Sequence, residues 1–160
     1  METSNMNLAS IITIDRVQQR QDLHSKKRVL EEISHLLASG AGALPESEIL
    51  ASLVGREKLG STGLGQGVAI PHGRMRGIES SIGAFIRLDA AVDYESNDGQ
   101  KVDLVFGLLV PQNCNEEHLK ILAGLAEMFL DEGLCERVRS SKDPQTLHKL
   151  LTQYTSAAAA

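Results

Sequence analysis

Residues Gly55–Arg74, which read GREKLGSTGLGQGVAIPHGR, are the most informative stretch of the chain. Four glycines of this stretch fall within eight residues, which is too many for a helix interior or a central strand. Glycine backbones can bend past a ligand and present bare N–H groups to an anion. The stretch therefore predicts an anion-binding loop. The predicted phosphate-loop residues are Gly60, Ser61, Thr62, Gly63, Gly65 and Gly67.

The loop ends at a candidate nucleophile. An apolar run over Val68–Ile70 predicts a short strand, which leads through Pro71 to His72. Neutral imidazole is nucleophilic at physiological pH because its pKa lies near 6.5. Arg56 and Lys58 add positive charge just upstream. Together these features suggest phosphate chemistry in which His72 itself carries the phosphoryl group. A turn histidine with satisfied hydrogen bonds is the alternative.

The ungapped segment REKLGSTGLGQGVAIPH over residues 56–72 resembles enzyme IIA domains of the bacterial phosphoenolpyruvate-dependent phosphotransferase system, of the fructose/mannitol class. Within that class the chain is most similar to the nitrogen-regulatory enzyme IIA. The sequence SKKR over Ser25–Arg28 resembles this branch in particular. The resemblance covers the chain from about Leu8 to about Tyr154.

The resemblance implies a role for each of three residues. His72 matches the family's phosphorylated histidine. His118, in the pattern V-P-x(6)-HL, matches a second histidine that hydrogen-bonds the phosphoryl group or the nucleophile. Arg56 matches an arginine whose planar guanidinium suits the phosphoryl oxygens. An exposed helix histidine is the alternative for His118. For Ser61 and Thr62, capping of the loop competes with phosphate binding.

The resemblance also implies a phosphotransferase activity that needs no cofactor and no metal. The chain would be a phosphocarrier that takes a phosphoryl group from an HPr-like carrier protein (NPr). Its regulatory targets would be potassium-transport components or sensor kinases. One alternative is a sugar-specific enzyme IIA that passes phosphate to a IIB domain, and another is a non-catalytic binding module. A third alternative, metal-dependent hydrolysis through His72 and His118, would need carboxylate ligands that the sequence motifs do not place beside them.

Composition excludes several other classes. The 160 residues fit one domain, and the net charge of −5 argues against a general nucleic-acid binder. The N-terminus has no apolar signal core, and no apolar run approaches the roughly 20 residues of a membrane span, so we expect a cytoplasmic protein without membrane insertion. Cys114 and Cys135 form no C-x-x-C motif, which predicts free thiols and no metal site.

Helical and strand patterns interleave, which predicts the α/β (α+β) class with a single domain over residues 8–154 and loose tails over 1–7 and 155–160. From the resemblance we expect a central mixed sheet with helices on both sides. The apolar run over Asp103–Val110 predicts a central strand buried on both faces. The remaining predicted elements are a strand over Ile82–Leu88, a turn at Asn97–Gly99, and helices over Ser25–Ser39, from Pro45 to between Gly55 and Gly60, after Asn115, over Leu134–Arg139 and from Asp143-Pro144.

Several side chains have plainer predicted roles. The helix after Asn115 is expected to carry Leu119, Leu122, Ala126 and Phe129 on one apolar face. Glu57 is expected to pair with a cation, because a phosphate pocket repels carboxylates. Leu64 is a candidate for the rim that a carrier protein would cover. The run Lys26–Arg28 predicts a solvated face, with a docking patch for an acidic partner as the alternative. Surface or packing roles without partners are predicted for His24, His35 and His148.

Overall fold

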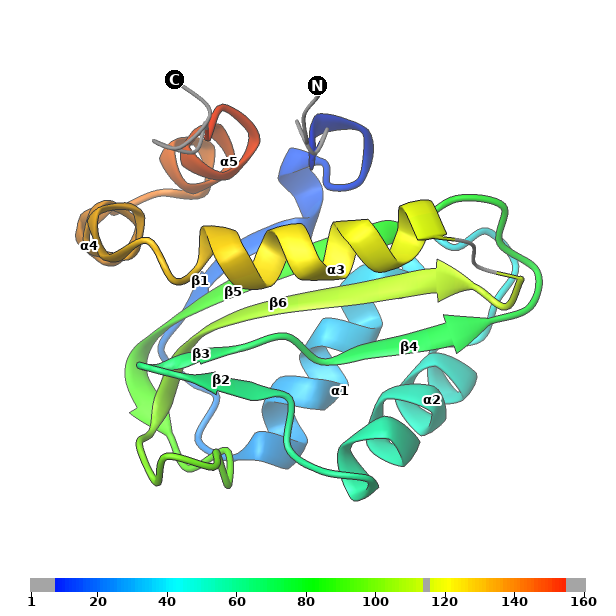
Figure 1. Ribbon diagram of the computed structural model, residues 1–160, viewed down its shortest axis with the longest axis horizontal. Coiled ribbons are helices and arrows are strands. Elements are labelled where there is room, and N and C mark those ends of the chain that lie inside the picture. Colours follow the sequence, from blue (N-terminus) through cyan, green and yellow to red (C-terminus); the bar gives the residue numbers. More distant parts are fainter. Residues whose placement is uncertain (1–7, 114–115, 155–160) are drawn as a thin grey trace.

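A mixed sheet of six strands runs through the middle of the molecule (Figure 1). This computed structural model describes residues 8–113 and 116–154, apart from the side chains of Glu117 and His118. The strands lie in the order β1–β5–β6–β3–β2, and β4 also pairs with β6. Their bounds are β1 Val17–Arg20, β2 Gly63–Gly65, β3 Val68–Ala69, β4 His72–Met75, β5 Ile82–Val92 and β6 Val102–Pro111. Parallel and antiparallel pairs alternate across the sheet, as expected for a mixed one.

Strand β6 is the central strand that the apolar run at Asp103–Val110 predicts. It pairs antiparallel with β5 on one side and parallel with β3 and β4 on the other. Most of its side chains are buried, because helices cover both faces of the sheet. Strand β5 is longer than predicted and ends at Val92 rather than Leu88. The turn predicted at Asn97–Gly99 is present between β5 and β6.

Helices cover the sheet on both sides, which confirms the expected architecture (Figure 1). Helices α1 (Lys26–Ala38) and α2 (Glu46–Lys58) pack on one face. On the other face lie α3 (Glu116–Met128), α4 (Glu132–Ser140) and α5 (Pro144–Thr152). Two short 3-10 turns, η1 (Leu8–Ser10) and η2 (Ile14–Arg16), precede β1.

Side-chain caps fix where several helices begin. The Ser25 hydroxyl accepts a hydrogen bond of 3.2 Å from the Arg28 amide, as predicted for α1. The Asp143 carboxylate accepts one of 2.8 Å from the Thr146 amide, and Pro144 follows it at the first position of α5. Asp131 caps α4 in the same way, so this helix begins at Glu132, two residues before the predicted start. The predicted cap Asn115 of α3 lies outside the described residues, as do the predicted tails.

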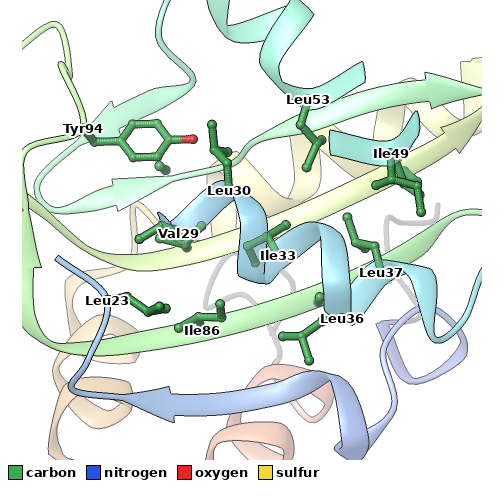
Figure 2. Close-up of a cluster of buried hydrophobic side chains, with 14 of the residues drawn as sticks. Leu23, Val29, Leu30, Ile33, Leu36, Leu37, Ile49, Leu53, Ile86 and Tyr94 are labelled. Atoms are coloured by element: carbon green, nitrogen blue, oxygen red, sulfur yellow. The ribbon is translucent and has the colours of Figure 1, made fainter. Parts of the chain in front are cut away.

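The core is split by the sheet into two apolar layers. Successive β5 residues point to opposite sides, so Phe85 packs with α3–α5 while Ile86 packs with α1 and α2. Figure 2 shows the layer under α1 and α2, where side chains of α1 such as Val29 and Ile33 lie over Ile86. In the opposite layer three phenylalanine rings meet, with Phe85 and Phe129 stacked at 5.9 Å between centroids. Both layers are needed to bury the two faces of β6.

Further features of the structure also differ from the sequence predictions. The apolar face predicted for α3 is buried only in part: its buried stripe is centred on Leu125 and Met128, and Leu119 is 52% exposed at the margin. Strands β1, β2 and β4 were not predicted. Strand β4 lacks an alternating apolar pattern, and it forms because β6 offers it a parallel partner and α2 covers it.

Candidate functional site

His72 is the first residue of β4, at a break in the edge that lies along β6. Strand β3 pairs with Leu104 and Val105, and β4 resumes the same parallel ladder with His72 opposite Leu108. Pro71 lies in the gap between them and has no N–H to donate, although its carbonyl accepts a bond of 3.0 Å from the Leu108 amide. The break places the histidine at the end of a short irregular segment rather than inside a continuous strand.

The His72 ring turns back onto the chain that precedes it. Its Nδ1 atom lies 2.8 Å from the Ile70 carbonyl oxygen. A carbonyl can only accept, so Nδ1 carries a proton, and in the neutral ring the lone pair is on Nε2. This is the geometry that a nucleophilic imidazole needs.

Burial is the main influence on the protonation of His72. It lowers the pKa of the imidazole from its ordinary value of 6.5, and the positive charge of Arg56 lowers the pKa further. The Ile70 carbonyl and the Glu57 carboxylate raise the pKa but do not reverse the shift. The ring is therefore neutral at pH 7, with a lone pair to offer.

Arg56 lies in the last turn of α2, near enough to His72 to change its pKa. Its Nη1 atom donates a bond of 2.9 Å to the Gly60 carbonyl, which ties the guanidinium to the start of the glycine-rich segment. The side chain is only partly buried. Its charge thus acts on the His72 ring, while its predicted role toward a phosphoryl group stays a prediction.

Close packing of α2 on β4 fixes where Arg56 lies relative to His72. A Cβ atom on Gly73 would overlap the Ser52 hydroxyl, so any other residue here would force that hydroxyl to move. The Ser52 hydroxyl also donates a bond of 3.3 Å to the Arg74 carbonyl. These contacts hold the residues on either side of Gly73 against the same helix that carries Arg56.

The glycine-rich segment forms a hairpin rather than an open loop. Strands β2 and β3 pair antiparallel, and the two residues between them, Gln66 and Gly67, both have positive φ, 58° and 85°. The hairpin tip is held from outside: the Asp98 carboxylate accepts from the Gln66 amide, and the Arg139 guanidinium donates to the Gln66 carbonyl. The tip glycines therefore have a structural reason to be glycine.

The start of this segment is also tied down. The Ser61 hydroxyl accepts a bond of 3.1 Å from the Gly63 amide, a capping contact of the kind weighed for Ser61. Thr62 binds the Glu57 carboxylate through its amide, at 3.1 Å, and through its hydroxyl. Phosphate binding by any of the six predicted loop residues stays a prediction.

Glu57 is the centre of a buried polar network that the sequence analysis only partly anticipates. Only 5% of its side chain is exposed, and Lys26 pairs with its Oε1 atom at 3.0 Å, as the expected cation partner. The Tyr94 hydroxyl donates to its Oε2 atom at 3.0 Å, beside the Thr62 hydroxyl. Lys26 also lies 4.7 Å from the centroid of the Tyr94 ring. Lys26 is thus partly buried in the network, which corrects its assignment to a solvated or docking face, while Lys27 and Arg28 are exposed.

His118 lies in the first turn of α3, as predicted. Its side chain, like Cys114, lies outside the described residues, so its role beside His72 stays a prediction. Leu64, the proposed rim residue, is 39% exposed on β2. Cys135 is buried, and its burial raises the pKa of the thiol.

The other histidines take no part in the site. The prediction that they lack partners was wrong for two of them: His35 Nδ1 lies 2.9 Å from Glu46, and His148 Nε2 lies 3.2 Å from the Ile12 carbonyl. His24 is exposed. Among the residues that the structure describes, no group of three or more histidine, cysteine, aspartate or glutamate side chains could hold a metal ion.

Comparison with known proteins identifies the family of the chain. The family model described as phosphoenolpyruvate-dependent sugar phosphotransferase system, EIIA 2, matches residues 10–154. The chain belongs to this EIIA family. Phosphotransfer is the family's common role, and the match includes the whole glycine-rich segment, His72 and His118.

The similar proteins in the EIIA family include nitrogen regulatory proteins. The nitrogen regulatory protein of Pseudomonas aeruginosa is 46% identical over 127 residues, which are 79% of this chain and 82% of that protein. That of Bradyrhizobium diazoefficiens is 38% identical over 154 residues, 96% of this chain and all of the other. The crystal structure of nitrogen regulatory protein IIA-Ntr from Neisseria meningitidis superposes with a TM-score of 0.85 at 39% identity, covering 91% of this chain and 99% of that one. The resemblance to the nitrogen-regulatory branch is thus confirmed.

No helix within the described ranges, 8–113 and 116–154, has the length and apolar character needed to span a bilayer.

Proposed function

We propose that this EIIA domain is a phosphocarrier that accepts a phosphoryl group on Nε2 of His72 from the phosphohistidine of an HPr-like carrier protein (NPr). The hydrogen bond from Nδ1 to the Ile70 carbonyl supports this most directly. It occupies one ring nitrogen as a donor and leaves the lone pair on the other. Membership of a phosphotransfer family supports the same reaction.

The transfer is a displacement at phosphorus. The Nε2 lone pair forms the new N–P bond while the N–P bond of the donor histidine breaks, and the donor ring nitrogen keeps that electron pair. The proton on Nδ1 stays in place, held by the Ile70 carbonyl, so the phosphorylated His72 ring carries positive charge and is a good leaving group for onward transfer. Positioning and charge neutralisation suffice for such a step, because the transition state is loose.

Arg56 is the proposed source of charge neutralisation. Its guanidinium lies at the end of α2 near His72 and has N–H groups beyond the one that binds Gly60. A planar fork of donors fits the equatorial phosphoryl oxygens. His118, in the first turn of α3, is proposed to hydrogen-bond the phosphoryl group or His72, and the amides of the glycine-rich segment to contribute further donors.

The proposed end point is regulation in the cytoplasm rather than sugar transport. Similar proteins carry the name nitrogen regulatory protein, which supports this assignment. A phosphoryl group adds about −1.5 to −2 charge at neutral pH, enough to permit or veto a protein contact at a partly buried histidine. The expected targets are potassium-transport components and sensor kinases.

A phosphorelay assay followed by intact mass spectrometry tests the proposal. The protein is incubated with phosphoenolpyruvate, enzyme I and an HPr-like carrier, next to the variants His72→Gln and His24→Gln. We expect one acid-labile phosphoryl group on the wild type and on His24→Gln, because His24 is exposed and outside the site, and none on His72→Gln. Phosphorylation of His72→Gln, or of none of the three proteins, would overturn the proposal. Adding a fructose- or mannitol-type IIB domain then separates the two end points, since only a sugar-specific protein should lose its phosphoryl group to it.

A further inference from the structure

Three hydrogen bonds, joined through the backbones of Thr62 and Ile70, link a buried carboxylate to the His72 ring. Glu57 Oε1 accepts from the Thr62 amide at 3.1 Å. The Thr62 carbonyl accepts from the Ile70 amide at 3.1 Å. The Ile70 carbonyl accepts from His72 Nδ1 at 2.8 Å. Residues from the end of α2, the hairpin and the start of β4 are thereby joined in one series.

The carboxylate end of this series is firmly anchored. Glu57 is held by the Lys26 ammonium and by the hydroxyls of Thr62 and Tyr94, and its side chain is almost completely buried. Burial and the neighbouring carboxylate raise the pKa of Tyr94, so its hydroxyl stays a donor. Lys26 comes from α1, Tyr94 from the connection between β5 and β6, and Thr62 from the segment before β2, so three separate parts of the fold fix one carboxylate.

We propose that Glu57 is a positioning residue for phosphoryl transfer, which acts through Thr62 and Ile70 to hold the His72 ring with its proton on Nδ1 and its lone pair on Nε2. The inference rests on the proposed function of His72 and extends it. Glu57 contacts neither nucleophile nor phosphoryl group in this scheme, so it is not itself a catalytic residue.

Two physical effects follow from anchoring a carboxylate at the far end of the series. The Glu57 carboxylate holds the Thr62 amide, and the Thr62 carbonyl holds the Ile70 amide, so the backbone of Ile70 is fixed where its carbonyl accepts from Nδ1–H. The negative charge also favours the protonated ring directly and opposes Arg56, which lies on the same helix end. The ammonium of Lys26, on α1, partly neutralises the charge of Glu57 and so weakens this effect on the ring. The side chain of His118, on α3, lies outside the described residues.

Nuclear magnetic resonance of the His72 ring nitrogens separates this role from a purely structural one. In the wild-type protein we expect the Nδ1–H tautomer. In Glu57→Gln, which keeps the shape and loses the charge, we expect a mixture of tautomers and a lower His72 pKa. The acid limb of the rate of phosphoryl acceptance should move to lower pH, and the rate at its plateau should fall on the order of tenfold. Glu48→Gln, an exposed carboxylate on the same helix, is the matched control and should match the wild type.

A second pair of variants guards against loss of folding in Glu57→Gln. Thr62→Val keeps the backbone series but removes a hydroxyl that helps to anchor Glu57, and Thr62→Ser keeps that hydroxyl. Thr62→Val should therefore loosen Glu57 and shift the tautomer balance, whereas Thr62→Ser should match the wild type. A folded Glu57→Gln with unchanged His72 tautomer and pKa would overturn the inference, as would equal behaviour of Thr62→Val and Thr62→Ser should Glu57→Gln not fold. Failure of the wild type to accept phosphoryl would instead overturn the proposed function, and the ring measurements would still decide the role of Glu57.

Discussion

The Ser52 hydroxyl lies directly over Gly73, so close that no other side chain fits at position 73 without displacing it. This contact joins α2 to β4 beside His72. Because Arg56 is one turn further along α2, the spacing of Arg56 and His72 depends on it. The site is therefore set by the packing of a helix on a strand as much as by the residues that do the chemistry.

A double-mutant cycle tests this packing. Gly73→Ala should lower the free energy of unfolding by about 1–3 kcal/mol, because the added methyl group has no room. In a Ser52→Ala background the same change should cost less, since the overlapping hydroxyl is gone. Urea unfolding of the four proteins measures both values. An identical cost in the two backgrounds would show that this contact does not control the approach of α2.

The order in which two histidines titrate is a second prediction. Burial and Arg56 lower the pKa of His72 below 6.5, whereas the hydrogen bond and charge of Glu46 raise that of exposed His35 above it. Acceptance of a phosphoryl group needs the neutral His72 ring, so its rate should be flat through neutral pH and fall only as acid protonates the ring. Ring-proton chemical shifts followed from pH 4 to 9 give both values, and the reverse order would contradict this description of the site.

Removing the charge at position 56 should move the pKa of His72 in the direction opposite to removing the charge at position 57. Arg56→Gln takes away a positive charge, so the pKa of His72 should rise, and loss of the guanidinium should slow phosphoryl acceptance on the order of 100-fold. Lys58→Gln removes an exposed cation two residues along the same helix and should leave both quantities as in the wild type. Single-turnover kinetics measure the rate. A Lys58→Gln protein as slow as Arg56→Gln would indicate a general effect of charge on carrier docking instead.

The core makes a prediction of its own. Ile33 is completely buried between α1 and the sheet (Figure 2), so Ile33→Ala should lower the free energy of unfolding by about 2–5 kcal/mol. Leu59, just past the end of α2, is 84% exposed, and Leu59→Ala should change stability by less than about 0.5 kcal/mol. Denaturant unfolding compares the two. A large loss in Leu59→Ala would mean that this leucine is covered in solution.

Local rules account for the parts of the fold that the sequence predicts well. The caps Ser25 and Asp143 act within three residues of themselves, and the continuous apolar run of β6 reflects burial on both faces. Strand β1 could not be predicted because its partner residues in β5, such as Phe85 opposite Val17, lie far away in the chain. Strand β4 could not be predicted for the same reason, since its short polar sequence becomes a strand only beside β6.

The residues of the site also fall into those that the sequence predicts and those that only the structure identifies. His72 and Arg56 are found from the motif that surrounds them, because the motif is contiguous. The network around Glu57 cannot be found from a motif. Lys26 lies 31 residues before Glu57 and Tyr94 lies 37 residues after it, and only folding brings them together. The burial of Lys26 could not be read from its position in a run of charged residues. The positive-φ turn at the hairpin tip likewise explains glycines that the motif alone assigns to phosphate.

The site of phosphorylation within the ring is the most direct test of the whole account. Phosphorylated, ¹⁵N-labelled protein is examined by nuclear magnetic resonance for coupling between phosphorus and each nitrogen of His72. We expect coupling to Nε2, with Nδ1 still protonated by its contact with the Ile70 carbonyl. A phosphoryl group on Nδ1, or on a histidine other than His72, would contradict the account.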